Sequence, residues 1–224
     1  MANRTDPSSP PRSPLSPARL FGTAVTLADR DGLGAVTMRK LAAELDVEAM
    51  SLYHHVANKD EILDGMVDAV FAEIDLPSPE AAWKPALRRR AISVRQVLRI
   101  HPWATALMES RPTPGPATLR HHDAVLGLLR TAGFSVALAA HAFSVLDSYI
   151  YGFAMQEVAL PFDDTESLAE LAVGILSGIP ADEYPHLVEL TTEHILQPGY
   201  DYAHEYEFGL DLILDGLEQA VAES

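Results

Sequence analysis

The chain has 224 residues, no cysteine, and 32 acidic against 16 basic side chains, which gives a formal net charge of −16. The lack of cysteine excludes a disulfide scaffold, a thiol nucleophile and cysteine-ligated zinc, while the 48% apolar content is enough for a real core. No run reaches the roughly 18 apolar residues of a membrane span. The first residues also lack the apolar stretch of a signal peptide, so we expect a cytoplasmic protein without a membrane segment.

The charge is distributed unevenly along the chain. Residues 1–60 carry seven basic and seven acidic side chains, whereas residues 131–224 carry 17 acids and no lysine or arginine. Polyphosphate would repel the acidic part, so any contact with nucleic acid is expected in the N-terminal part.

The N-terminal part begins with an arm and a first helix. Residues 1–14 are rich in proline and serine, which predicts a disordered arm. Ser16 before Pro17 predicts the N-cap and first residue of a helix. The sequence Asp31-Gly-Leu-Gly34 then ends this helix.

Three further helices are predicted before the first strong break. Thr37 is the expected N-cap of a short helix that ends near Leu45, and a second short helix is expected over 49–56. Asn58 predicts the cap of a longer helix with one apolar face. Leu76-Pro-Ser-Pro79 then breaks the chain, which places a domain boundary there and gives a first domain over 15–76.

Every segment in the remainder, residues 77–224, predicts a helix, and no stretch alternates long enough to form a strand. Proline and glycine separate the expected helices, which span 80–100, 103–110, 116–131, 135–159, 165–177, 184–196 and 203–222. The sequence therefore predicts an all-α fold.

The segment 37–56 predicts two short helices joined by a tight turn. Leu41, Ala42 and Leu45 can pack against the second helix, which leaves small and hydrogen-bonding side chains facing outward. A short helix of this kind fits the major groove of DNA. Arg39 is placed to reach a guanine edge or a phosphate, and Lys59 a phosphate. An ordinary helical hairpin remains the alternative on spacing alone.

These residues resemble the DNA-binding region of the TetR family of bacterial regulators. The matching residues are Thr37, Arg39–Ala42, Val47-Glu48, Leu52-Tyr53, His55-Val56 and Asn58-Lys59, and further matches include Trp83, Leu87, Arg111–Thr113, Gly133–Ser135 and Phe208–Leu210. The resemblance implies a homodimer that binds a palindromic double-stranded operator through a helix-turn-helix domain. It also implies that a small effector releases the DNA by entering a larger helical ligand-binding and dimerisation domain. The expected DNA contacts are Thr37, Arg39, Ala49, Met50, Ser51, Tyr53, His54, His55 and Lys59.

Several positions depart from the family's tetracycline-responsive members. There, a histidine at the position of Leu107 helps to hold a magnesium–drug chelate, and an asparagine and a phenylalanine occupy the positions of Arg90 and Val94. Losing the imidazole and the amide predicts an apolar effector that is bound without metal, and Ala49 and Met50 predict a different operator. Arg90, Arg111 and Asp123 are expected to point inward, with isolated surface pairing as the alternative. The expected ligand-binding residues are Arg90, Val94, Trp103, Leu107, Arg111, Asp123, Phe143, Leu146 and Tyr149.

Two acid–histidine pairs raise the possibility of a metal-dependent helical enzyme whose N-terminal helices only pack. Glu183 with His186 and Asp201 with His204 have the Glu-x-x-His spacing of di-iron bundles. Pro185 interrupts the first pair, and Pro198-Gly199 precedes the second, so neither is expected within a regular helix. We therefore expect no metal, no cofactor and no catalytic residue.

An apolar stripe near the C-terminus predicts dimerisation. The stripe consists of Phe208, Leu212, Ile213, Leu217 and Val221, with Gly209 and Gly216 between them. Because a lone helix with this stripe would expose much apolar surface, we expect the segments 135–159 and 203–222 to form the dimer contact.

Overall fold

The computed structural model describes residues 14–108, 110–162 and 164–223, so the arm predicted over 1–14 lies outside the described residues except for Pro14. All regular elements in these ranges are helical, which confirms the predicted all-α fold. The N-terminal helices are α1 (Pro17–Asp31), the 3₁₀ turn η1 (Leu33–Ala35), α2 (Met38–Leu45), α3 (Ala49–Leu52) and α4 (Lys59–Phe71). The remaining helices are α5 (Trp83–Ile100), α6 (Ala104–Met108), α7 (Pro116–Thr131), α8 (Val136–Ala159), α9 (Thr165–Leu176), α10 (Pro185–Leu190), the π-helical turn η2 (Thr191–Ile195) and α11 (Tyr202–Ala222).

Side-chain caps begin the helices where the sequence predicted them. The hydroxyl of Ser16 accepts a hydrogen bond from the amide of Arg19, and Thr37 accepts one from the amide of Lys40. The Asn58 side chain accepts a hydrogen bond from the amide of Glu61 in the same way. Each cap satisfies an amide that the helix itself leaves without a partner, and so fixes the first turn.

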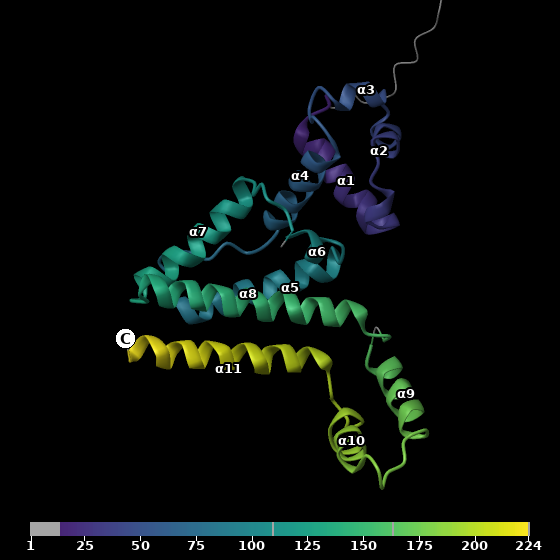
Figure 1. Cartoon of the computed structure of the whole chain (residues 1–224), viewed down its shortest axis with the longest axis vertical. Helices are drawn as coiled ribbons and strands as arrows, with labels where there is room; N and C mark the ends of the chain where they lie inside the picture. The colour runs from purple at the N-terminus through teal and green to yellow at the C-terminus, as the bar shows by residue number, and fades with distance from the viewer. Residues whose placement is uncertain (1–13, 109, 163, 224) are drawn as a thin grey trace, which may run out of the picture.

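The helices form two groups that meet along α4. In the first group, α1 packs on both α2 and α4, and α2 packs on α3. In the second, α8 contacts α5, α7 and α11, while α4 reaches across to α6 and α7. Figure 1 shows α2 and α3 at one end of the molecule and α11 alongside α8 at the other. The DNA-reading candidates and the acidic C-terminal helix therefore lie far apart.

Two predicted helices differ from the observed ones. The helix expected over 49–56 ends at Leu52, because the amides of Tyr53, His54 and His55 bond to carbonyls only three residues back. The helix expected over 184–196 is regular only to Leu190 and continues as η2. Tightening of the last turn is common at helix ends, whereas a π-type turn such as η2 is rare.

The long helix α8 is the one described helix long and apolar enough to cross a membrane by composition. Its buried side chains, including Ala142, Leu146 and Ile150, pack inside the chain, and the helix contacts α5, α7 and α11. These contacts are typical of the central helix of a globular core. The domain boundary predicted near Leu76–Pro79 falls in the connection between α4 and α5 and stays a prediction.

Candidate functional site

The turn between α2 and α3 presents the surface that is predicted to contact DNA. We call this surface the reading face. Leu41, Ala42, Leu45 and Leu52 are buried and hold the two helices together. Asp46 closes α2 in the left-handed conformation (φ 54°), and the amide of Val47 then bonds to the carbonyl of Ala42. This reversal after α2 directs α3 outward.

Most of the predicted DNA contacts are exposed on this face. Thr37, Arg39, Met50, Tyr53, His54 and Lys59 are exposed, and Ala49, Ser51 and His55 are half-buried. Met50 is 73% exposed, although methionine is an apolar side chain that is more often buried. The packing of α2 and α3 therefore leaves the side chains of this set available to a partner.

Some basic side chains near the reading face form ion pairs with acids of the chain, and others do not. Arg30 pairs with Asp31 and with Glu44, at 2.6 Å from the latter, and Lys40 lies 3.9 Å from Asp31. Arg39 and Lys59 make no ion pair with any other residue that the structure describes. Two cations are thus available for phosphates or base edges.

A buried histidine joins the two groups of helices. His101, at the end of α5, places Nδ1 2.7 Å from Asp29 of α1 and Nε2 3.1 Å from Glu73 after α4. The indole N–H of Trp103 donates to the same Asp29 oxygen at 2.7 Å. Burial lowers the pKa of His101, but the hydrogen bonds to both carboxylates outweigh burial and raise the pKa above its ordinary value.

Arg111, which was predicted to point inward, forms ion pairs with two aspartates of α4. Its Nε donates to Asp64 at 2.5 Å, and its Nη1 lies 3.2 Å from Asp60. Asp68, one turn further along α4, accepts hydrogen bonds from the amide and hydroxyl of Thr118 on α7. A cavity of about 180 Å³ lies beside these contacts, between α4, α6 and α7, and we call it the α4 cavity. Its lining includes Asp64, Val67, Met108, Arg111, Thr118 and His122.

A group of buried polar atoms without partners lies deeper in the second group of helices. Arg90 is only 2% exposed, and one of its nitrogens donates to Asp147 of α8 at 3.1 Å. Its other two guanidinium nitrogens, Thr105 Oγ1 and His121 Nδ1 find no hydrogen-bond partner among the described residues. Burial and the charge of Arg90 lower the pKa of His121, which keeps its ring neutral at pH 7. Unsatisfied buried polar atoms at this density call for an additional partner.

Four of the other predicted ligand residues lie in or against the core, and the fifth, Trp103, lies elsewhere. Val94 and Leu146 are buried, and Leu107 and Phe143 are half-buried against the same core. Phe143 also meets the ring of His122 edge-on, with the ring centroids 5.2 Å apart. Trp103 belongs instead to the junction with α1.

Asp123, which was predicted to face inward, needs correction, and Tyr149, which was predicted to bind the ligand, makes a contact within the chain. Asp123 lies on the exposed side of α7, because His121 and Val125 occupy the buried side. The hydroxyl of Tyr149 donates to the carbonyls of Glu205 and Tyr206, so Tyr149 fixes α8 to α11. Neither side chain is placed to orient a ligand in the core of the isolated chain.

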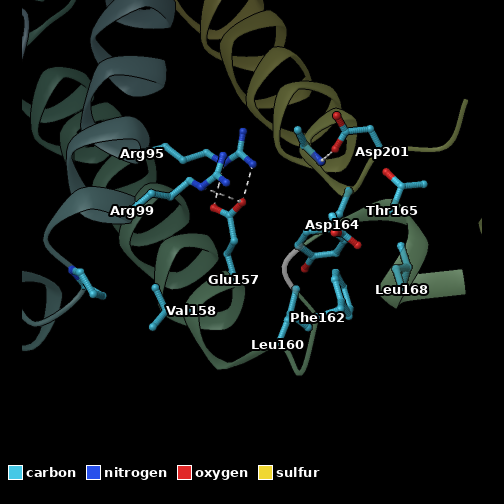
Figure 2. A pocket seen from close by; sticks show the side chains of 13 residues that line it. Arg95, Arg99, Glu157, Val158, Leu160, Phe162, Asp164, Thr165, Leu168 and Asp201 are labelled. Atoms are coloured by element: carbon cyan, nitrogen blue, oxygen red, sulfur yellow. Dashed lines mark hydrogen bonds and ion pairs between the residues drawn. The ribbon is translucent and has the colours of Figure 1, made fainter. Parts of the chain in front are cut away.

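A larger cavity of about 490 Å³ lies where α5, α8, α9 and α11 converge. Figure 2 shows Arg95, Arg99 and Glu157 on one side, and Phe162, Leu168 and Asp201 among the residues on the other. We call it the corner cavity. None of the nine predicted ligand residues lines it. Sequence reasoning missed the corner cavity, because its walls come from four helices whose convergence no local pattern signals.

The C-terminal helix leaves part of its predicted stripe uncovered. Phe208 and Leu212 are 66% and 58% exposed, whereas Leu217 is buried in the chain's own core. Gly209 serves a contact within the chain, since a β-carbon there would overlap the Tyr149 hydroxyl. Gly216 has open space beside it. The predicted stripe is thus divided between the chain's own core and a free face.

The predicted metal-type pairs do not gather into a cluster. His186 of the first pair contacts Glu189 at 3.5 Å, and Asp201 of the second pair caps α11 by accepting a hydrogen bond from the amide of Ala203. Within the described ranges, no three of the histidine, aspartate and glutamate side chains come together as metal ligands.

Comparisons with known proteins agree with this architecture. The family model "Bacterial regulatory proteins, tetR family" matches residues 20–66, and "Tetracyclin repressor-like, C-terminal domain" matches residues 76–221. The HTH-type transcriptional repressor DrrR1 of Streptomyces coeruleorubidus is 32% identical over 97% of this chain and 82% of its own length. The class A tetracycline repressor from transposon 1721 in Escherichia coli is 30% identical, with 91% and 90% covered.

A solved structure gives the same result for the fold. ActR of Streptomyces coelicolor, in complex with actinorhodin, superposes with a TM-score of 0.77 at 30% identity, covering 93% of this chain and 99% of ActR. Fold and site together define a helix-turn-helix DNA-binding regulator with a helical ligand-responsive domain. The chain belongs to the TetR family of bacterial transcriptional regulators, as the sequence resemblance predicted.

Proposed function

We propose that this protein is a cytoplasmic repressor, without catalytic activity, that binds a palindromic operator as a homodimer. Residues 15–76 would bind DNA, and residues 77–224 would bind the effector and the partner subunit. The observation that carries the proposal is the reading face: α3 is held by a buried α2–α3 contact while Arg39, Met50, Tyr53 and Lys59 stay exposed.

Each predicted contact has a role that its chemistry supports. Arg39 pairs with a guanine edge, and Lys59, at the start of α4, pairs with a phosphate. Tyr53, His54 and Ser51 offer hydrogen bonds to bases or phosphates. Thr37 binds a phosphate, Ala49 and Met50 offer apolar contacts in the groove, and His55 lies beside them at the end of α3.

The proposed effector site extends from the α4 cavity to the buried polar atoms near Arg90. Val94, Leu107, Phe143 and Leu146 supply an apolar wall, and the free nitrogens of Arg90 supply donors for an oxygen of the ligand. ActR, which binds actinorhodin, supports a small organic effector. The α4 cavity, at about 180 Å³, is smaller than the several hundred Å³ that a drug-sized ligand occupies. The helices around it must therefore separate when such a ligand enters.

That separation explains how ligand binding would release DNA. Arg111 ties the segment after α6 to Asp60 and Asp64, and Thr118 ties α7 to Asp68. All three aspartates lie on α4, and Lys59 begins the same helix. A ligand that pushes α6 and α7 away from α4 moves Lys59 and α3 relative to the rest of the dimer. The ligand must bind the released form more tightly, since equal affinity for both forms shifts no population.

The proposal is tested by footprinting the protein on the DNA upstream of its own and neighbouring genes. Affinity for the protected site should fall steeply with salt, because bound phosphates exchange counterions. A helical enzyme whose N-terminal helices only pack would protect no DNA. No affinity for any of this DNA at low salt would contradict the proposal.

The metal-free effector site has a separate test. The side chain of Leu107 has no atom that can coordinate magnesium, whereas a histidine at this position helps to hold a magnesium–drug chelate in the tetracycline-responsive members. Tetracycline with magnesium should therefore not release the protein from its operator, with EDTA-treated samples as the control. Release that requires magnesium would show that the site holds a metal chelate.

A further inference from the structure

Four of the six basic side chains of α5 each form a close ion pair with one or two acids. Lys84 contacts Asp215 and Glu218, Arg88 contacts Glu207 and Asp211, Arg90 contacts Asp147, and Arg95 contacts Glu157. Each of these contacts is 3.1 Å or shorter, and each acid belongs to α8 or α11. Because residues 131–224 contain no lysine or arginine, α5 supplies the positive charge at these contacts.

Two arginines of α5 depart from this pattern. Arg89 is exposed away from the corner cavity, and Arg99 lies in the last turn of the helix. Its nearest carboxylate oxygen is that of Glu157, 3.9 Å away, and Arg95 already donates to both oxygens of Glu157 at 2.5 and 2.9 Å. Arg99 makes no hydrogen bond with any described residue, and its side chain is 59% exposed. It lines the corner cavity (Figure 2). One cation with free donors therefore faces a space large enough for a ligand.

The walls of the corner cavity favour an aromatic body. Phe162 and Tyr202 meet edge to face with their ring centroids 6.1 Å apart, and Leu168 lies on the α9 side. A volume of about 490 Å³ falls in the range that encloses small organic ligands. Edge-to-face pairs such as this one present both ring faces and ring edges to a further ring.

The acids at the cavity already have partners. Glu157 is held by Arg95, while Asp164 and Asp201 cap α9 and α11 by accepting amide hydrogen bonds at 2.8 Å from Ser167 and Ala203. Hydrogen bonds from Ser167 lower the pKa of Asp164 and keep it ionised. The donors of Arg99 have no such partner, so an anion that enters the cavity meets free hydrogen-bond donors at Arg99.

We propose that the corner cavity is a second ligand site that binds a small aromatic carboxylate. The carboxylate pairs with Arg99, and the ring lies among Phe162, Leu168 and Tyr202. This site shares no lining residue with the α4 cavity, so the proposal does not depend on the effector site.

The probe is 2-naphthoate, titrated into the full-length protein by calorimetry, with 2-naphthylmethanol and 2-naphthylmethylammonium as its neutral and cationic counterparts. Naphthoate should bind more tightly than either counterpart. Arg99→Gln should weaken its binding about tenfold, the size of a lost charge-assisted hydrogen bond, and Arg99→Lys should restore part of it. The matched control is Arg89→Gln, since Arg89 is an exposed arginine of α5 outside the cavity.

Two further variants locate the bound probe. Leu168→Trp fills the cavity from α9 and should remove naphthoate binding, whereas His122→Ala, in the α4 cavity, should leave it unchanged. The helical circular dichroism and unfolding temperature of each variant establish that it is folded. Equal affinity for the three probes, or an unchanged affinity in Arg99→Gln, overturns the proposal. Loss in His122→Ala with retention in Leu168→Trp does so too, because the probe then occupies the effector site.

Discussion

Arg39 and Lys59 are both available cations, but they differ in what they are placed to touch. Arg39 lies in the first turn of α2 and is proposed to pair with a base edge. Arg39→Ala should therefore weaken operator binding by about 1–3 kcal/mol and relax the preference at one base pair. Tyr53→Ala should also weaken operator binding without unfolding the protein, since Tyr53 is exposed. Fluorescence anisotropy with the operator and with single-base variants measures both effects.

Lys59 gives the contrasting result in the same assay. Lys59→Ala should weaken binding to all sequences alike and reduce the salt slope by about one, because it removes one phosphate contact. Arg89→Ala, far from the reading face on α5, serves as the control. Wild-type affinity for the Arg39, Tyr53 and Lys59 variants alike would show that another surface reads the DNA.

His101 makes the junction between the two helix groups sensitive to pH. Both ring nitrogens face carboxylate oxygens, so only the doubly protonated ring donates to both. Because the folded-state pKa is raised above the ordinary value near 6.5, the stabilisation is complete below about pH 6.5. It is lost as the pH rises through the folded-state pKa. Thermal unfolding measured from about pH 6 to pH 9 should show this loss.

His101→Gln is the matched variant for this measurement. Glutamine keeps a donor but carries no titrating charge, so its unfolding temperature should lie below that of the wild type at low pH and vary less over the window. His186→Gln, an exposed histidine on α10, should behave as the wild type. If the unfolding temperature of His101→Gln depends on pH in the same way as that of the wild type, His101 is not the cause of the pH dependence.

The residue-level predictions succeeded where a side chain's role is local. Caps at Ser16, Thr37 and Asn58 depend on the next three residues alone, so the sequence identifies them. The partners of His101 lie 72 and 28 residues away along the chain, so no local pattern around His101 identifies them. For the same reason Asp123 was placed inward: the buried side of α7 is decided by α8 and α4, not by α7's own sequence.

At the scale of elements, the tight turn after α2 depends on one strained residue. Asp46 adopts a left-handed conformation, which aspartate and asparagine tolerate and β-branched residues do not. Asp46→Val should therefore destabilise the fold by about 1–2 kcal/mol and weaken operator binding, while Asp46→Asn should be close to neutral. Denaturant unfolding with operator titration measures both, and equal stability of the two variants would argue against strain at this turn.

The positions of the helices can be predicted from the sequence because proline and glycine separate them. The way in which the helices pack cannot be predicted in this way. The connection Arg111–Pro116 and the turn at Ala132-Gly133 appear as breakers in the sequence, and α7 lies between them as predicted. The corner cavity needs the ends of four helices to converge, and the free energy that decides such packing is spread over the whole core. The end of α3 depends on hydrogen bonds of the last turn, which sequence periodicity resolves poorly.

At the scale of the whole molecule, the uncovered face of α11 predicts the dimer. Phe208 and Leu212 stay exposed although the helix packs on α8 through its other side. Leu212→Asp should shift the protein toward monomer and weaken operator binding, because a charge at such a contact is costly to bury. Analytical ultracentrifugation at micromolar concentration measures the shift.

The control for the dimer is Leu76→Asp, which places the same charge on an exposed leucine between α4 and α5. This variant should sediment as the wild type does. If the wild-type protein sediments as a stable monomer at these concentrations, the exposed face of α11 is not a dimer contact.

The segregation of charge gives the molecule an electrical polarity along its long dimension. The end that carries α2 and α3 is nearly neutral, while the part from Thr131 onward holds 17 acids and no lysine or arginine. Six of these acids pair with basic side chains of α5, and the others leave this end acidic. In the field of a DNA duplex such a molecule experiences a torque, since its acidic end is repelled while its reading end is not. Diffusing copies therefore meet DNA already oriented, with α3 leading. The same repulsion limits how closely two bound molecules can sit on neighbouring sites, and this spacing should shorten as added salt screens the acidic ends.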